Sequence, residues 1–324
     1  MSPTPYDEGP IRIGVSTCLL GEEVRFDGGH KRDRFLTDVL GPFVEWVAVC
    51  PEVEAGMGIP REAVHLEDRD RSGLLRMVGV KSGKDHTAAM NRLSRRRVRE
   101  LDSLDLCGYV LKKGSPSCGM ERVRIFHGKG MPSRDGRGLF AAALMKRRPL
   151  LPVEEEGRLH DPPLRENWIE RVFAYRRLRN LFAGRLSQRR LVEFHTAHKL
   201  QLLAHSPQGY RELGRLVARA QDLPAAELRR VYEQGFMTAL SRKATPGRNR
   251  NVLEHMLGYF RDRLDADTRA EIAQLIEDYH ARLVPLVVPL SLVAHYVRRL
   301  DVEYLRGQVY LEPHPKELML RNHA

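Results

Sequence analysis

The chain has 324 residues, of which 54 are lysine or arginine and 42 are aspartate or glutamate, so its formal net charge is +12. Hydrophobic residues make up 42% of the sequence, which excludes a disordered chain, and four cysteines in this length exclude a disulfide-rich scaffold. At about 100 to 200 residues per domain, the length predicts two domains.

The N-terminus and the apolar stretches predict neither export nor membrane insertion. Residues 1–10 lack the basic and apolar regions of a signal peptide. The longest apolar stretch, 283–293, contains two prolines and is shorter than the roughly 20 residues that a membrane span needs. We therefore expect a soluble, cytoplasmic protein with reduced thiols.

The first 150 residues alternate between short apolar runs and helical segments. The predicted strands are 11–16, 46–49, 74–80, 106–111 and 122–126. The predicted helices between them are 34–41, 86–104 and 138–145. Near-continuous apolar strands separated by helices predict an α/β, Rossmann-like domain with a mostly parallel sheet, which we assign to residues 1–150.

The rest of the chain, residues 151–324, is predicted to be a linker followed by an all-α domain. Residues 149–163 are rich in proline and glutamate and form the connector. Ser187 and Asp267 are the expected N-caps of two of the helices beyond it. The predicted helices are 164–182, 188–204, 208–220, 224–238, 249–264, 268–284 and 289–300.

The positive charge is divided evenly between the two predicted domains. Residues 1–150 hold 26 basic and 20 acidic residues and the remainder 28 and 22, so each part carries +6. A polyanion such as RNA lying across both domains fits this division. A solvated, arginine-rich surface without a partner fits it as well.

Three of the four cysteines follow predicted strands. Cys18, Cys50 and Cys118 lie in loops rich in Pro, Gly and Ser, and ligands of parallel sheets bind outside the carboxyl ends of the strands. Cys107 instead lies within an apolar strand, where a free cysteine usually acts as a small buried hydrophobe. No CxxC pair occurs, which argues against a zinc ribbon or a thioredoxin-type site.

Three thiolates suit a 4Fe–4S cluster whose fourth iron lacks a protein ligand and is open to substrate. A three-cysteine zinc site is the competing inorganic interpretation. A single nucleophilic cysteine with a histidine is a third, although His30, His65 and His127 have no distinguishing context.

Two polar residues accompany the candidate ligands. Glu52 follows Cys50 by two residues and is a candidate general base if its pocket is partly dry. Ser115 precedes Cys118 by three residues and is able to orient a water or a substrate by hydrogen bonding. A surface carboxylate and a turn serine are the alternative interpretations.

Three motifs together resemble the thiouracil desulfidase family over roughly residues 10–150. They are GVSTCLLGEEVRFDGG at 14–29, VCPE at 49–52 and KGSPSCG at 113–119. The DHT at 85–87 and the segment 128–144, with GRGL, are similar to that family as well. Phe26 stands where many relatives are expected to have tyrosine.

The second half resembles the helical domain that is often fused to this family. Its cues are FHTAHKL at 194–200, NVLEHMLGYF at 251–260 and PLVVPL at 285–290. The two-domain form resembles the tRNA 4-thiouridine desulfidases, in which the helical part is linked to tRNA binding.

The resemblance implies a 4Fe–4S cluster held by Cys18, Cys50 and Cys118, a catalytic carboxylate at Glu52 and a catalytic hydroxyl at Ser115. It implies removal of sulfur from 4-thiouridine in tRNA, giving uridine and hydrosulfide. We expect no protein partner and no membrane association. The open iron is expected to bind the sulfur, while Glu52 activates a water that Ser115 aligns.

Basic residues in both domains are candidates for binding the RNA. Arg25, Lys31 and Arg32 follow the first cysteine loop, and Lys199 belongs to the helical domain. Two alternatives remain open: a desulfidase of free thiouracil or thionucleotides, and a zinc-containing RNA-binding module without catalysis.

Overall fold

The computed structural model describes residues 9–70, 72–128, 130–184 and 186–323. These residues divide into two compact units. The first is Pro10–His160, and the second comprises the residues from Asp161 onward together with Gly9. The division lies ten residues beyond the expected one at 150, because Val153–Glu155 pairs with the N-terminal sheet as strand β8. Most of residues 1–10, where no signal peptide is expected, lie outside the described residues.

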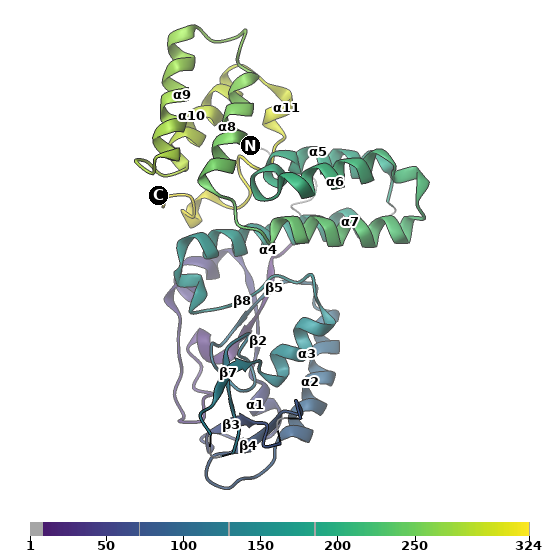
Figure 1. Ribbon diagram of the computed structural model, residues 1–324, viewed down its shortest axis with the longest axis vertical. Coiled ribbons are helices and arrows are strands. Elements are labelled where there is room, and N and C mark those ends of the chain that lie inside the picture. The colour runs from purple at the N-terminus through teal and green to yellow at the C-terminus, as the bar shows by residue number, and fades with distance from the viewer. Residues whose placement is uncertain (1–8, 71, 129, 185, 324) are drawn as a thin grey trace. The chain divides into compact units, whose positions relative to one another are not determined.

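The first unit contains an all-parallel sheet, as predicted (Figure 1). Its order is β2-β1-β5-β8, with bounds Glu45–Val49, Arg12–Ser16, Leu106–Leu111 and Val153–Glu155. All six residues of β5 are buried, which explains their continuous apolar run. Gly14 in β1 pairs with Tyr109 in β5, whose ring occupies the space that a side chain at position 14 would need.

A second sheet in the same unit combines parallel and antiparallel pairs. Its order is β4-β3-β6-β7, with bounds Arg76–Gly79, Val64–Glu67, Val123–Phe126 and Ser133–Gly136. The strands predicted at 74–80 and 122–126 therefore lie in this sheet, not in the parallel one. Antiparallel pairing joins β3 to β4 and β6 to β7, since each pair is linked by a short loop that permits it.

Helices of the first unit are short except for two that lie side by side (Figure 1). These two are α2, Thr87–Asp102, and α3, Leu139–Arg147. Met90 and Leu93 of α2 pack into a core with Met77 of the second sheet. The shorter elements are η1 (Thr17–Leu20), η2 (Phe35–Leu40), η3 (Gly41–Phe43), α1 (Pro51–Glu54) and η4 (Arg158–His160).

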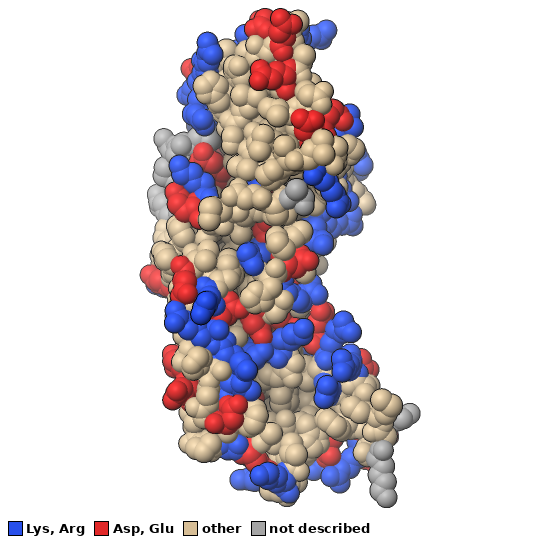
Figure 2. All heavy atoms as spheres, turned by 90° about the vertical axis from the view of Figure 1, so that its left-hand side faces the viewer, with Lys and Arg blue, Asp and Glu red and all other residues tan. Residues whose placement is uncertain are grey.

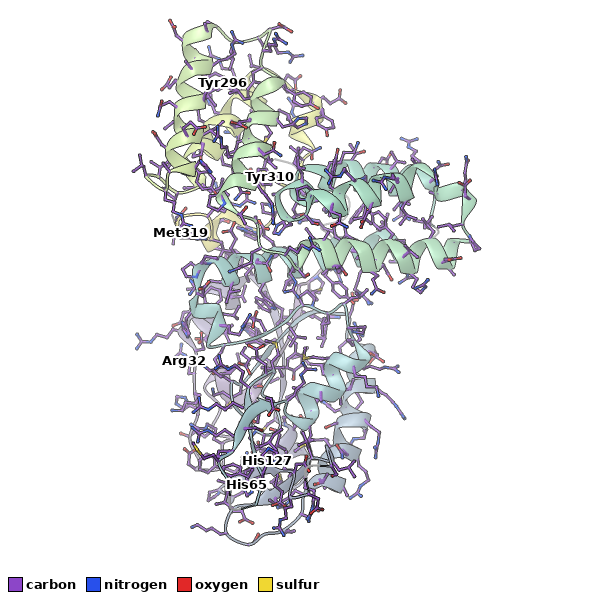
Figure 3. All side chains as sticks on the ribbon, viewed as in Figure 1. Arg32, His65, His127, Tyr296, Tyr310 and Met319 are labelled. Atoms are coloured by element: carbon purple, nitrogen blue, oxygen red, sulfur yellow. The ribbon has the colours of Figure 1, made fainter. Side chains whose placement is uncertain are left out.

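Of the histidines considered above, His65 lies in β3 and His127 directly follows β6 (Figure 3). The ring of His65 meets Phe126 edge-on, with 4.7 Å between the centroids. His127 contacts the carbonyl oxygen of Asp68 through Nδ1 and the hydroxyl of Ser133 through Nε2, each at 3.0 Å. Both imidazole rings therefore make their contacts with residues in or next to the second sheet.

The second unit is helical throughout, which confirms the predicted fold class. Its longer helices are α4 (Pro162–Phe182), α5 (Gln188–His205), α6 (Pro207–Ala218), α7 (Ala225–Leu240), α8 (Pro246–Gly258), α9 (Ala266–His280) and α10 (Val287–Arg299). Its shorter elements are η5 (Ala220–Asp222), α11 (Glu303–Arg306) and η6 (Lys316–Leu318). Among the described residues, no helix combines the length and apolar composition that crossing a membrane requires.

One of the two predicted helix caps is correct. The Ser187 hydroxyl accepts a hydrogen bond from the Arg190 N–H at the start of α5, as expected. For α9 the prediction of Asp267 is wrong, because Asp265 accepts the N–H of Thr268. Asp267 instead lies in the first turn, where a carboxylate favours the positive end of the helix.

A buried ionic network fixes the C-terminal segment of the second unit. Arg321 donates to Glu170 at 2.7 Å and to the Tyr310 carbonyl oxygen at 2.6 Å. His205 contacts the other oxygen of Glu170, also at 2.7 Å. Removing one member of such a buried set leaves an uncompensated charge, so the network specifies the arrangement of α4, α5 and the C-terminus.

Acid should destabilise the second unit through His314. Burial, aided by the charge of Arg321, lowers the pKa of His314 from 6.5 to about 4. Between these values the unfolded chain binds a proton that the folded chain does not, so stability falls as the pH drops through this window. We expect the difference in unfolding free energy between wild type and His314→Asn to shrink by about 1–2 kcal/mol from pH 7 to pH 5 in urea titrations. An unchanged difference would contradict this assignment.

Charged side chains of both signs share one face of the molecule. On the face drawn in Figure 2, lysine and arginine are interspersed with aspartate and glutamate and do not form a single patch. Net charge alone therefore does not locate a binding site.

Candidate active site

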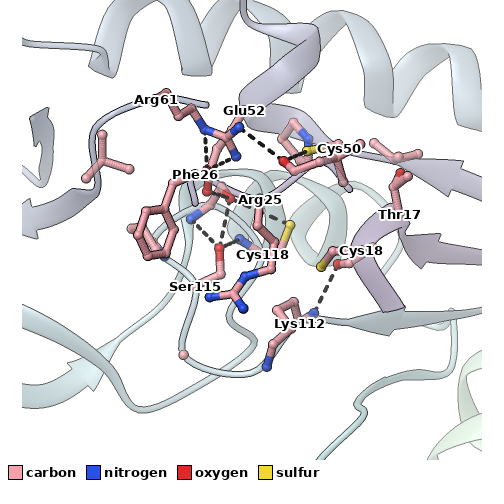
Figure 4. Close-up of a pocket in the computed structure, with 18 of the residues that line it drawn as sticks. Thr17, Cys18, Arg25, Phe26, Cys50, Glu52, Arg61, Lys112, Ser115 and Cys118 are labelled. Atoms are coloured by element: carbon pink, nitrogen blue, oxygen red, sulfur yellow. Dashed lines mark hydrogen bonds and ion pairs between the residues drawn. The ribbon is translucent and has the colours of Figure 1, made fainter. Parts of the chain in front are cut away.

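A cavity of about 220 Å³ opens at the carboxyl ends of the parallel strands (Figure 4). Cys18, Cys50 and Cys118 all line it, together with Glu52 and Ser115. The strands β2, β1 and β5 are neighbours, so the loops that follow them meet at one edge of the sheet. The other lining residues are Ser16, Thr17, Val24, Arg25, Phe26, Val49, Pro51, Arg61, Ala63, Val64, Lys112, Lys113, Gly114, Pro116 and Ser117.

Each lining cysteine occupies a distinct local setting. Cys18 lies in η1, directly after β1, and Cys50 is the N-cap of α1, directly after β2. Cys118 ends the turn that follows β5, where its backbone N–H donates to the Ser115 hydroxyl. Cys107, by contrast, is fully buried inside β5 and does not line the cavity. The structure therefore separates three cysteines from the fourth.

The Cys18 and Cys118 side chains are buried, and that of Cys50 is partly exposed. Burial raises the pKa of Cys18 to about 11, with the neighbouring Cys50 adding to the effect. Burial likewise raises the pKa of Cys50 and of Cys118 above the ordinary thiol range. Thiols of this kind are protonated at neutral pH until a metal displaces the proton, and they are poor free nucleophiles.

The thiols share a cavity without converging on one point. In the described part of the chain, no three His, Cys, Asp or Glu side chains are placed to hold a single metal ion. Four cationic residues line the cavity, namely Arg25, Arg61, Lys112 and Lys113, against one acidic residue, Glu52. The charges of these cations favour a negatively charged inorganic group in the cavity.

Glu52 is held in place by bonds to both carboxylate oxygens. Arg61 donates to Oε2 through Nη2 at 2.6 Å and through Nε at 3.1 Å. The Ser117 hydroxyl donates to Oε1 at 2.7 Å. The Arg61 side chain is only 5% exposed, and that of Glu52 14%, so solvent screens this ion pair weakly.

Ser115 reaches Glu52 through Ser117. The two hydroxyl oxygens are 2.9 Å apart, and Ser115 Oγ also accepts the backbone N–H groups of Ser117 and Cys118. Because the Ser117 proton points to Glu52, the Ser115 hydroxyl is the donor to Ser117. The geometry thus forms a chain for a proton from Ser115 through Ser117 to Glu52.

Sequence reasoning missed Arg61 and gave no role to Ser117. Arg61 lies outside every helix and strand, and no motif marks it. Besides binding Glu52, it donates to the Val24 carbonyl oxygen at 3.1 Å, and its backbone N–H donates to that of Phe26 at 2.9 Å. Arg61 therefore ties the carboxylate to the loop that carries Phe26.

Of the expected RNA-binding residues near the cysteine loop, only Arg25 lines the cavity. Arg25 lines it, and its guanidinium lies 5.4 Å from the centre of the Phe26 ring, which is 40% exposed. Lys31 and Arg32 do not line it, although the Lys31 backbone N–H donates to the Cys18 carbonyl oxygen. Arg32 is paired with Asp38 at 2.6 Å.

None of the three histidines considered as partners of a nucleophilic cysteine, His30, His65 and His127, lines this cavity. Together with the raised thiol pKa values, this leaves a cysteine–histidine nucleophile without structural support.

Comparisons with known proteins assign the two units to different families. Residues 13–156 match the model of the 2-thiouracil desulfurase family, and residues 199–315 match a family described as a protein of unknown function, DUF1722. The uncharacterised protein YbgA of Escherichia coli strain K12 is 36% identical over 160 residues, which cover 48% of this chain and 94% of YbgA. The uncharacterised protein YbbK of Bacillus subtilis strain 168 is 28% identical over 137 residues, covering 41% of this chain and 88% of YbbK.

A solved structure is similar in sequence. It is described as a [4Fe-4S]-dependent thiouracil desulfidase, TudS, is 34% identical to this chain, and covers 47% of this chain and 94% of its own, with a TM-score of 0.38. The match at 13–156 spans nearly all of the unit Pro10–His160, including every cavity residue. The chain therefore belongs to the 2-thiouracil desulfurase family and carries a DUF1722 domain later in the sequence than its desulfurase domain.

Proposed function

We propose that the protein is an iron–sulfur-dependent desulfidase that converts 4-thiouridine in tRNA to uridine and hydrosulfide. The observation that carries the proposal is the cavity in which three cysteines, a carboxylate and two hydroxyls meet at the ends of adjacent parallel strands. The family of the first unit and the activity named for its TudS relative support a reaction at a carbon–sulfur bond.

The donor set suits a 4Fe–4S cluster held by Cys18, Cys50 and Cys118. Three thiols line one cavity together with four cationic residues, and thiolate is the usual protein ligand of iron–sulfur clusters. When bound, such a cluster with one open iron would supply a thiophilic Lewis acid for the sulfur of the substrate.

The protein's own residues supply the proton transfer. A water beside Ser115 gives a proton to the Ser115 hydroxyl as Ser115 passes its own proton to Ser117 and Ser117 passes its proton to Glu52, and the resulting hydroxide attacks C4 of the base. The bond from C4 to sulfur breaks, a carbonyl forms at C4 and sulfur leaves as hydrosulfide, so the net reaction is hydrolysis without change of oxidation state. Arg61 holds the Glu52 carboxylate in position throughout.

A base within folded RNA must leave its stack to enter this cavity, which costs a few kcal/mol. The exposed Phe26 ring at the cavity, backed by Arg25, offers a surface on which a displaced base can stack. Basic residues on both units supply the charge for holding phosphates meanwhile.

The substrate is tested by comparing rates. Reconstituted protein is given thiolated tRNA or free 4-thiouracil at equal concentrations, and hydrosulfide release is measured. We expect the higher kcat/KM with tRNA. A clear preference for the free base would show that the enzyme acts on thiouracil and would overturn the tRNA assignment.

The metal is tested separately by anaerobic purification. We expect a brown protein with about four irons and matching labile sulfide per chain. A colourless protein containing zinc would instead support an RNA-binding module without catalysis.

A further inference from the structure

A second cavity, of about 280 Å³, lies within the helical unit, lined by residues of α4, α8, α9 and the C-terminal segment. Helices α8 and α9 lie side by side (Figure 1). The cavity shares no residue with the cysteine cavity. Pro163, Pro246 and Leu286 give it an apolar wall. Since an apolar cavity of about 150 Å³ holds a benzene ring, this one admits a molecule of roughly ten non-hydrogen atoms.

One of the two carboxylates at this cavity is fully bonded within the fold. The two oxygens of Glu170 accept from Arg321 and from His205, each at 2.7 Å. The other ring nitrogen of His205 lies 2.6 Å from the carbonyl oxygen of Arg242. Both ring nitrogens therefore face acceptors, so the ring carries two protons and a positive charge. Two buried cations thus neutralise Glu170, which leaves no charge there for a ligand.

The other carboxylate, that of Glu166, is poorly bonded. Its contacts in the described part of the chain, to Arg321 Nε and to His323 Nε2, are both 3.3 Å long. Burial and the neighbouring charge of Glu170 raise the pKa of Glu166 above its ordinary value. The Glu166 side chain is 18% exposed, against 4% for Glu170, so the cavity gives access to it. A carboxylate in this setting gains stability from a further cation beside it.

Lys243 and Arg282 bring unneutralised positive charge to the same cavity. Both side chains are exposed, and neither has a carboxylate partner within the described ranges, whereas Arg250 of α8 pairs with two carboxylates. Arg282 follows α9 with a φ of 62°, the left-handed conformation in which helices most often end on glycine. The chain therefore keeps a cation at a position where glycine would be less strained.

Tyr279 adds a hydrogen-bond donor to the cavity wall. Its hydroxyl accepts the side-chain N–H of Asn249 at 2.8 Å, and the Asn249 oxygen in turn accepts the Tyr310 hydroxyl at 3.0 Å. The proton of the Tyr279 hydroxyl has no acceptor among the described residues. The cavity thus offers one anionic acceptor, two cations and a neutral donor.

We propose that this cavity binds a small zwitterion, namely an α-amino acid with an apolar side chain of about the size of leucine. Glu166 takes the ammonium group of the ligand, and Arg282 and Lys243 take its carboxylate. An amine alone would leave the two cations unpaired, and an anion alone would leave the poorly bonded carboxylate unpaired. The site is independent of the desulfidase reaction, because it shares no residue with the cysteine cavity.

Three probes with related apolar bodies test the proposal on the full chain. L-Leucine carries both charges, isopentylamine lacks the carboxylate and 4-methylpentanoate lacks the ammonium group. Titration calorimetry and the shift of the melting temperature measure binding. We expect the Kd of L-leucine to be at least about tenfold lower than that of either single-charge probe, since each charged hydrogen bond contributes about this factor or more. No binding of L-leucine, or a single-charge probe that binds as tightly, would overturn the proposal.

Two variants test the charges separately. Glu166→Gln should abolish the preference for L-leucine over 4-methylpentanoate, and Lys243→Gln/Arg282→Gln should abolish its preference over isopentylamine. Glutamine keeps the size of the Glu166 side chain. The melting temperature of Glu166→Gln at pH 7 should equal or exceed that of wild type, because a raised pKa means that folding disfavours this carboxylate. Lost binding is thereby separated from lost folding.

Matched controls change exposed residues of the same unit outside the cavity. Glu271→Gln and Arg261→Gln/Arg299→Gln should bind all three probes as the wild type does. A merely structural role of the cavity residues would change the melting temperature and weaken all three probes alike. If the cavity variants keep the wild-type preferences, the proposal is overturned even when the wild type binds L-leucine. Sulfide release plays no part in this test, so its outcome is separate from that of the proposed function.

Discussion

Cys50→Ser protein, purified and reconstituted without oxygen, should contain no stable 4Fe–4S cluster and should release no hydrosulfide from thiolated substrate. Cys18→Ser and Cys118→Ser should behave alike, because the three thiols line one cavity and the cluster needs all of them. Iron and labile sulfide content, the absorbance near 400 nm and sulfide release measure the effect.

Cys107→Ala is the matched control. Cys107 is a cysteine of the same sheet, but it is buried within β5 away from the cavity. It should retain the cluster and the activity, with only a small loss of stability from the truncated side chain. Iron retained in Cys50→Ser, or lost in Cys107→Ala, would contradict the assignment of the ligands.

Glu52→Gln should retain the cluster and lose about 10²- to 10⁴-fold in kcat, because the amide cannot accept the proton that Ser117 delivers. Glutamine is preferred to alanine here. Alanine would remove every acceptor that position 52 offers to the buried Arg61 guanidinium, and breaking a buried pair in this way costs about 3–5 kcal/mol of stability.

Glu54→Gln controls for changing a carboxylate of the same short helix. Glu54 is paired with Arg97 at 3.2 Å and does not line the cavity. It should keep the activity of the wild type. Full activity in Glu52→Gln with intact iron content would remove Glu52 from the role of general base.

Sequence patterns located the cavity because its parts depend on local signals. The apolar runs of β1, β2 and β5 predict buried parallel strands, and parallel strands bring the loops after them together. Cys18, Cys50 and Cys118 therefore meet, whereas Cys107 within β5 does not.

The parts that sequence reasoning missed depend on long-range contacts. β7, Ser133–Gly136, is polar and mostly exposed, so it has no alternating apolar pattern and forms through pairing with β6. β8 lies in a segment whose proline and glutamate content predicts a connector. Arg61 reaches Glu52 from a loop, and only the folded chain shows that contact.

Lys199 is a predicted RNA-binding residue in α5, and Arg211 and Arg215 of α6 line the same hollow only because α6 packs against α5. In a sequence, these residues are indistinguishable from the solvated cations of any helical domain.

The most direct test of the central claim is the 4-thiouridine content of bulk tRNA, measured by nucleoside analysis before and after incubation with anaerobically reconstituted protein. We predict that 4-thiouridine disappears, with an equal amount of hydrosulfide released and uridine left in its place. Unchanged 4-thiouridine, with a protein that carries its full iron and sulfide, would contradict the account.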